Sequence, residues 1–178
     1  MADFACDDLL ALVREMLEPL AAANGNRFEL IADGDLGTLR SDQFRLRQCL
    51  LNLGSNAAKF TKDGVISVIA RREPRGSREG ICFDVRDTGM GMCAEVVGRL
   101  FEPFRQGEDS IARQFGGTGL GLAITRELVR LLGGDIRVES EPGAGTTFSL
   151  WIPADCVAVP AAAAKHPGQN LSQLVSAT

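Results

Sequence analysis

Three polar residues lie along one stripe of an otherwise apolar segment, LLNLGSNAAKF at residues 50–60. A helix turns about 100° per residue, so Asn52, Asn56 and Lys59 would share one face. Amide oxygens suit a hard cation such as Mg²⁺, and a lysine suits phosphate. The stripe therefore predicts either a metal–phosphate site or a solvated edge of the helix. A second stripe, about 120° around the helix, can face a core and consists of Leu46, Leu50, Leu53 and Ala57.

Two glycine-rich segments follow. In DVRDTGMGM (84–92), Asp87 ends an expected strand and precedes Gly89 and Gly91. A carboxylate there can accept a hydrogen bond from an exocyclic amine such as adenine N6, although a plain turn fits this pattern equally well. In QFGGTGLGLAIT (114–125), four glycines run into a helix start, where unpaired N–H groups favour an anion. Together with the polar stripe, these segments predict a pocket for Mg²⁺–ATP.

The order and spacing of these motifs resemble the ATP-binding domain of bacterial sensor histidine kinases, over residues 41–153. The resemblance implies the Bergerat ATP-binding fold, which gyrase, the Hsp90 chaperones and MutL share. The expected architecture is an α/β (α+β) two-layer sandwich, with a mixed, mostly antiparallel sheet and helices on one face. The matching segments are LLNLGSNAAKFT for the N box, DTGMGM for the first glycine box, LFEPFRQ for the F box, GGTGLGLAI for the second glycine box and GAGTTFSL for the last strand.

This resemblance also implies roles for individual residues. Asn56 would ligate Mg²⁺, Asn52 would support the metal or the phosphates, and Lys59 would contact phosphate. Asp87 would accept from adenine N6. Phe101 would help to anchor a lid over the nucleotide, with core filling as the alternative. The other residues implied to bind ATP are Phe60, Gly89, Gly91, Phe104, Arg105, Gln106, Gly117, Thr118, Gly119, Leu120, Gly121, Leu122 and Thr146.

Position 52 distinguishes branches of this superfamily. By this resemblance, the relatives that hydrolyse ATP carry a glutamate four residues before the metal-binding asparagine, where it activates water. Asn52 cannot serve as such a carboxylate base. The γ-phosphoryl is therefore expected to pass to a histidine on a separate dimerisation domain, since His166 lies in an Ala/Pro-rich tail. The alternatives are a non-catalytic nucleotide-sensing module that regulates by docking, and an ATPase, which Asn52 disfavours.

The elements that must position these residues follow from periodicity and turn signals. Pro19 is expected to kink or end the first helix. Residues 101–118 lack a period and predict a lid. The arginines at 71, 72, 75 and 78 indicate either an anion patch or a solvated hairpin tip, and Glu73 and Glu79 favour the tip because they offset the positive charge. The expected helices are 7–22, 41–61 and 120–134, and the expected strands are 27–33, 38–40, 65–72, 81–87, 135–141 and 146–153.

Three parts of the chain are expected on this basis. Residues 1–24 form a helical lead-in from a missing dimerisation and phosphoacceptor domain. Residues 25–153 form the ATP-binding catalytic domain, and residues 154–178 form a flexible tail or linker. The implied partners are the dimerisation and histidine-phosphotransfer domain of the same kinase and the receiver domain of a response regulator. The parent kinase would be a homodimer and a candidate hybrid kinase, with its membrane anchorage left open.

Composition narrows the remaining classes of function. The net charge of −4 argues against a nucleic-acid partner. No apolar run reaches the roughly 18–20 residues of a membrane span, so this fragment is expected to make no membrane contact. The five cysteines are scattered without metal or CxxC spacing and predict reduced thiols in a cytoplasmic setting.

Overall fold

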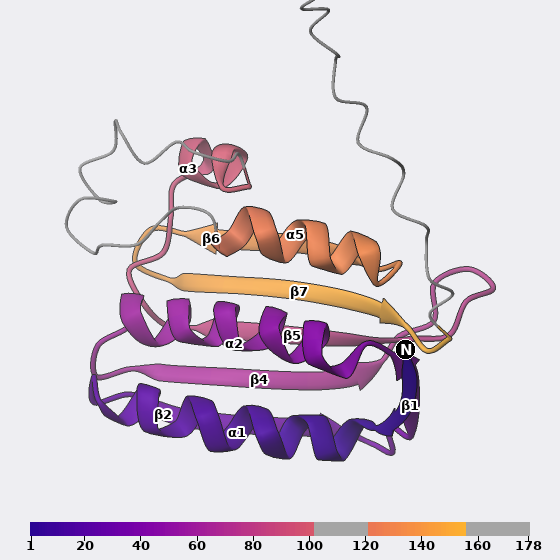
Figure 1. Ribbon diagram of the computed structural model, residues 1–178. Helices are drawn as coiled ribbons and strands as arrows, with labels where there is room; N and C mark the ends of the chain where they lie inside the picture. Colours follow the sequence, from indigo (N-terminus) through magenta and orange to yellow (C-terminus); the bar gives the residue numbers. More distant parts are fainter. Residues whose placement is uncertain (102–120, 156–178) are drawn as a thin grey trace, which may run out of the picture.

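Five strands form the main sheet in the order β2-β4-β5-β7-β6. The computed structural model describes residues 1–101 and 121–155 of the chain. Figure 1 shows the arrangement of the elements. Their bounds are β1 Ala2–Ala5, α1 Cys6–Ala22, β2 Arg27–Asp33, β3 Thr38–Ser41, α2 Gln43–Phe60, β4 Val65–Arg72, β5 Gly80–Asp87, α3 Ala94–Arg99, α5 Gly121–Leu131, β6 Asp135–Glu141 and β7 Gly145–Pro153.

The sheet is mixed and mostly antiparallel. Strand β2 runs parallel to β4, whereas the three other pairings are antiparallel. Alternate residues of β4, namely Ile66, Val68 and Ala70, are buried on the side that carries the helices. Helices α1, α2 and α5 lie side by side over that face (Figure 1). The predicted two-layer sandwich with helices on one face is therefore confirmed, as are both predicted hairpins.

Helix α2 is the central helix of this layer. Its N-terminus is capped by Asp42, whose side chain accepts a hydrogen bond from the Arg45 backbone N–H at 3.0 Å. The predicted apolar stripe is buried, with Leu46 and Leu50 at 0% exposure. Gly54 lets α1 approach closely, because a Cβ there would lie 2.7 Å from Leu17 Cδ2. The apolar stripe thus fixes the rotation of α2 and turns its polar stripe away from the sheet.

Helix α1 is part of the same core. Leu9, Val13 and Leu17 are at most 1% exposed and belong to the core cluster that α2 also enters. The helix continues past Pro19 and ends at Ala22, the end expected from sequence, so Pro19 does not itself end the helix. Pro19 lies in the last turn, where its missing N–H would have bonded only the carbonyl of the exposed Glu15. Residues 1–24 therefore pack together with the expected catalytic domain, while their role as a lead-in from a preceding domain stays a prediction.

Strand β1 and helix α3 are not foreseen by sequence. The four residues of β1 pair antiparallel with β3. The other edge of β3 binds the end of the described chain, because Arg40 N donates to Ala154 O at 2.9 Å. Strand β1 and the residues that follow β7 therefore lie on the two edges of β3. This strand precedes α2 at the end of the domain opposite to the end of β5 (Figure 1).

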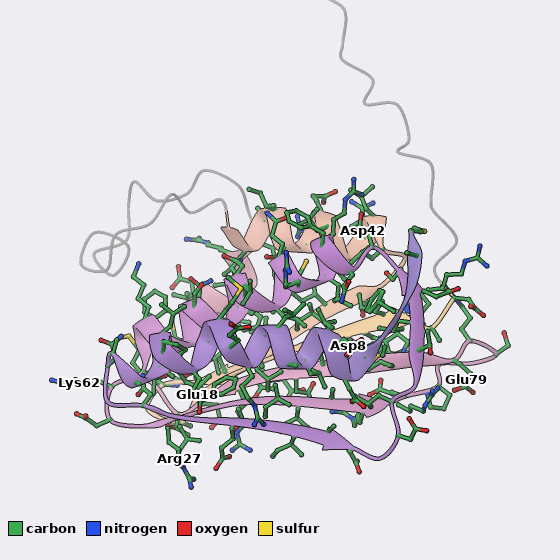
Figure 2. All side chains as sticks on the ribbon, turned by 60° about the horizontal axis from the view of Figure 1, so that its bottom comes forward. Asp8, Glu18, Arg27, Asp42, Lys62 and Glu79 are labelled. Carbon is green, nitrogen blue, oxygen red and sulfur yellow. The ribbon has the colours of Figure 1, made fainter. Side chains whose placement is uncertain are left out.

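The tip of the β4–β5 hairpin is exposed at residues 76–79, as the expected solvated tip requires, and its arginines also contact Trp151. The guanidinium groups of Arg75 and Arg78 lie 5.1 and 5.6 Å from the centroid of the Trp151 ring. The Trp151 indole N–H donates to the carbonyl of Glu73 at 2.7 Å. The tip thus covers a 5% exposed tryptophan on the sheet face away from the helices. In Figure 2, Glu79 of this hairpin lies at the opposite end of the domain from Lys62, which follows α2.

Candidate functional site

Asp87 lies where β5 ends, beside the end of α2 and opposite Thr146 of β7. The residue is 7% exposed, and its Oδ1 accepts from Gly89 N at 2.8 Å. Burial raises the pKa of the Asp87 carboxyl, against the opposing effect of the Gly89 and Thr146 backbone amides. A carboxyl group that is expensive to bury is thus held at the edge of the sheet. Its bond to the backbone N–H two residues on is also the bond of an Asx-turn, so the geometry is compatible with both interpretations of this segment.

A second polar group accompanies it. The hydroxyl of Thr61, the residue after α2, is buried and has no hydrogen-bond partner within residues 1–101 and 121–155. It is near enough to Asp87 to oppose the rise in that carboxyl's pKa, but it lies outside hydrogen-bonding geometry. A Cβ on Gly89 would lie 2.7 Å from Thr61 Oγ1 and 2.9 Å from Asp87 Oδ1, so both oxygens flank this glycine. An unsatisfied buried hydroxyl costs about 1–3 kcal/mol, which a bound molecule with a polar edge would remove.

The loop after Asp87 is pinned to the β6–β7 hairpin. Gly91 has a φ of +65°, and a Cβ there would collide with the carbonyl of Glu141. Met92 N donates to Ser140 Oγ at 2.8 Å, and the same oxygen lies 2.9 Å from Thr146 Oγ1. The predicted glycine box is therefore a close backbone contact, and the contacts of this loop are made within the chain itself.

The polar stripe of α2 lies on the side of α5. Asn52 and Asn56 are half-buried and Lys59 is exposed. Asn52 Nδ2 donates to Thr125 Oγ1 at 2.8 Å, and Thr125 Oγ1 donates to Gly121 O at 2.9 Å. In the described part of the chain, the side chain of Asn56 makes no hydrogen bond. The structure thus ties one asparagine to α5 and leaves the other available to a ligand.

The other predicted residues divide into two groups. Phe60 and Leu122 are half-buried, and the Lys59 ammonium lies 5.5 Å from the Phe60 ring centroid. Phe101 packs against the core with Arg126 5.5 Å from its ring centroid, which agrees with core filling and with anchoring alike. The remaining predicted residues lie outside the described residues, as does the proposed lid from residue 102 on: Phe104, Arg105, Gln106, Gly117, Thr118, Gly119 and Leu120.

Sequence reasoning missed two threonines of this region. Thr61 follows directly on Phe60 and lies within the quoted N box, so its position was a usable signal. Thr125 falls on the buried side of an amphipathic helix, where a threonine is ordinarily a helix residue bonded to its own backbone. Its partner Asn52 lies 73 positions earlier in the chain, a separation that no local pattern encodes.

The residues present fit a Mg²⁺–nucleotide. Asp87 and Thr61 offer an acceptor and an unpartnered hydroxyl to a base edge, and Asn56 offers an amide oxygen. In the described ranges, no group of three or more His, Cys, Asp and Glu residues could hold a metal ion. A Mg²⁺ ion here would therefore take further oxygen ligands from phosphates and water, as this ion commonly does.

No helix among the described residues has the length and apolarity to cross a membrane.

Residues 41–155 match a family model described as histidine kinase-, DNA gyrase B- and HSP90-like ATPase. Sensor histidine kinase AruS of Pseudomonas aeruginosa is 41% identical over 175 residues, which are 97% of this chain and 17% of AruS. Circadian input-output histidine kinase CikA of Synechococcus elongatus is 45% identical over 133 residues, which are 74% of this chain and 17% of CikA. The chain thus spans about a sixth of the length of these relatives.

Solved structures agree with the fold. The nucleotide-free catalytic domain of histidine kinase ThkA superposes with a TM-score of 0.71 at 25% identity, covering 86% of this chain and 97% of that domain. Full-length ShkA in complex with AMPPNP gives a TM-score of 0.75 at 33% identity, covering 89% of this chain and 32% of ShkA. The complex of ThkA with the response regulator TrrA, at 23% identity and a TM-score of 0.67, supports the fold alone.

Proposed function

We propose that this chain, which belongs to the histidine kinase-, DNA gyrase B- and HSP90-like ATPase family and is a histidine kinase catalytic domain, binds Mg²⁺–ATP and donates its γ-phosphoryl group to a histidine on a separate dimerisation domain. The observation that carries this proposal is the buried Asp87 carboxyl with the unpartnered Thr61 hydroxyl beside it. Both groups lie next to the polar stripe of α2. One end of the domain therefore offers groups for a base and groups for phosphates.

Asp87 recognises the adenine base. Its carboxylate, on a residue that is only 7% exposed, accepts from the exocyclic N6 amine of adenine in a charge-assisted hydrogen bond. Guanine carries an oxygen in place of that amine, and two acceptors facing each other in a buried site repel. The Gly89 N–H donates to one carboxylate oxygen at 2.8 Å and so helps to fix the direction of the acceptor.

The polar stripe of α2 binds the phosphates. Asn56 offers an amide oxygen to the metal, and Lys59 offers its ammonium to a phosphate oxygen. A bound Mg²⁺ supplies neutralisation of the negative charge on the phosphates during transfer. Asn52 holds its amide against α5 and has no basic group that could take a proton from water. The site thus positions the γ-phosphoryl group without activating water, which preserves it for a histidine nucleophile.

The partners we propose follow from the relatives named as sensor kinases. The acceptor histidine belongs to the dimerisation domain of the same kinase, which we place in a homodimer. The receiver domain of a response regulator then takes the phosphoryl group. We place this reaction in the cytoplasm, in keeping with the free thiols of Cys6, Cys49, Cys82 and Cys93 in the described part of the chain.

Calorimetry with three nucleotides tests the base assignment. In the presence of Mg²⁺, ATP and ADP are expected to bind, whereas GTP is expected to bind at least roughly tenfold more weakly because of one reversed hydrogen bond. Inorganic triphosphate serves as the control for phosphate contacts alone. Equal affinity for ATP and GTP would contradict the role of Asp87.

A further inference from the structure

We infer that Thr125 is a positioning residue that fixes which end of the Asn52 side-chain amide faces the first turn of α5. The orientation itself follows from the hydrogen bonds of Thr125. What the oriented amide does for a nucleotide rests on the proposed function. Thr125 contacts neither phosphate nor metal in this account and acts through Asn52.

The hydroxyl of Thr125 has a single proton. It donates that proton to Gly121 O at 2.9 Å, one turn back in its own helix. Toward Asn52 the hydroxyl can therefore only accept, so the nitrogen Nδ2, and not the oxygen, must face it at 2.8 Å. Thr125 is 1% exposed, so water cannot readily replace either partner.

The amide oxygen of Asn52 is thereby placed on the side of Gly121. A Cβ on Gly121 would lie 2.7 Å from Asn52 Oδ1 and 3.2 Å from Nδ2, so the oxygen is the nearer atom. It lies in the same helical stripe as Asn56, one turn away. An oxygen in this position favours a cation or its bound water, whereas an NH₂ group would repel them.

The same arrangement sets a requirement on residue 52. A carboxylate there could not donate to Thr125, so the threonine would have to turn its proton away from Gly121 O. An amide keeps both hydrogen bonds. Thr125 and Asn52 therefore form a matched pair between α5 and α2, and the pair favours an amide where a water-activating residue would need a carboxylate.

The alternative is a purely structural threonine, whose only partner of consequence is its own helix backbone. Two variants separate the readings. Thr125→Val keeps the shape but removes the hydroxyl, and Thr125→Ser restores it. Ser67→Ala removes another buried hydroxyl, bonded to Glu29 at 3.3 Å on the other sheet face, and is the matched control.

The first measurement uses the protein without nucleotide. Nitrogen-resolved NMR of the Asn52 side-chain NH₂ is expected to show slow hydrogen exchange in the wild type, in Thr125→Ser and in Ser67→Ala. Thr125→Val is expected to lose this protection. Unchanged Asn52 amide signals in a folded Thr125→Val protein would overturn the inference, whether or not the chain binds ATP.

The second measurement compares ATP affinity with Mg²⁺ and with a chelator. In Thr125→Val the gain in affinity from Mg²⁺ is expected to fall about three- to tenfold, the worth of one hydrogen bond, with Mg²⁺-free affinity unchanged. Thr125→Ser is expected to retain the gain. Equal losses with and without Mg²⁺, or equal effects of Val and Ser, would show a structural threonine. Absence of ATP binding by the wild type would instead refute the proposed function and leave the amide orientation to the first measurement.

Discussion

Asp87 is the residue on which nucleotide recognition depends most directly. Replacing Asp87 with Asn keeps the size of the side chain but removes the charge that strengthens the bond to adenine. We expect ATP and ADP to bind about 1.5–3 kcal/mol more weakly, roughly ten- to a hundredfold. Isothermal titration calorimetry measures this change directly.

Asp84 provides the matched control for that substitution. It lies three residues earlier on the opposite face of β5, where it bonds Arg71 and Cys82 and not the loop of the site. Asp84→Asn is expected to leave nucleotide affinity within error of the wild type. Asp87→Asn binding as tightly as the wild type, or both variants losing affinity alike, would remove the adenine assignment.

The two aspartates also predict opposite effects on stability. Burial raises the pKa of Asp87, so the folded domain binds that proton more tightly than the unfolded chain does. The protonated carboxyl contributes fully to stability below pH 3.8, the ordinary pKa of an aspartate. This contribution is lost as the pH rises through the raised pKa of Asp87 in the folded domain. We therefore expect Asp87→Asn to make the nucleotide-free domain more stable at neutral pH, with the gain vanishing below about pH 4.

Asp84 has the reverse sign. Its burial raises its pKa, but hydrogen bonds from Ser149 and Arg71 outweigh that effect and leave the pKa lowered. Asp84→Asn is thus expected to destabilise the domain at neutral pH and to lose this effect in acid. Thermal unfolding from pH 3 to 8 measures both variants, and a loss of stability in Asp87→Asn at neutral pH would contradict the burial argument.

At the scale of elements, the loop after β5 depends on its contact with the β6–β7 hairpin. Gly91→Ala would put a Cβ against Glu141 O in a backbone conformation with φ of +65°. We expect a loss of more than about 1 kcal/mol in unfolding free energy, with weaker ATP binding, because the loop carries Gly89. Denaturant unfolding and calorimetry check the two effects.

Gly98 is the control glycine. It lies inside α3, and a Cβ there would meet nothing within 4 Å. Gly98→Ala is expected to be neutral or to stabilise, because alanine favours a helix more than glycine does. A Gly91→Ala protein as stable as Gly98→Ala would show that the loop is not held in the manner described.

Local patterns were sufficient for most elements and for part of the site. The stripe of Asn52 and Asn56 and both hairpins follow from periods and turn residues near in sequence. Strand β1 was missed because four residues carry too short an alternation, and their partner is β3, more than thirty positions away. The bond from Asn52 to Thr125 was missed for the same reason, since only the packing of α2 against α5 brings the two together.

At the scale of the whole molecule, α1 is expected to be indispensable to the fold. A chain that begins at residue 25 would lose Leu9, Val13 and Leu17 from a core cluster shared with α2 and the sheet. We expect this truncation to abolish cooperative thermal unfolding, because replacing a single buried leucine with alanine already costs about 2–5 kcal/mol. Removal of residues 159–178, which the sequence predicts to be a tail, is the matched control and should leave the unfolding midpoint unchanged. A cooperative transition in the chain that starts at residue 25 would make residues 1–24 a separable lead-in.

Phosphoryl transfer with γ-labelled ATP tests the central claim most directly. The chain alone, with Mg²⁺, is expected to bind ATP, to release almost no phosphate and to acquire no label, because Asn52 is no base and the proposed acceptor lies on another domain. Addition of the helical dimerisation domain from the parent kinase should transfer label to its histidine, and Asn56→Ala should abolish that transfer. Rapid multiple-turnover hydrolysis by the chain alone would contradict this account in favour of an ATPase. Tight binding without transfer to the cognate domain would contradict it in favour of a nucleotide sensor.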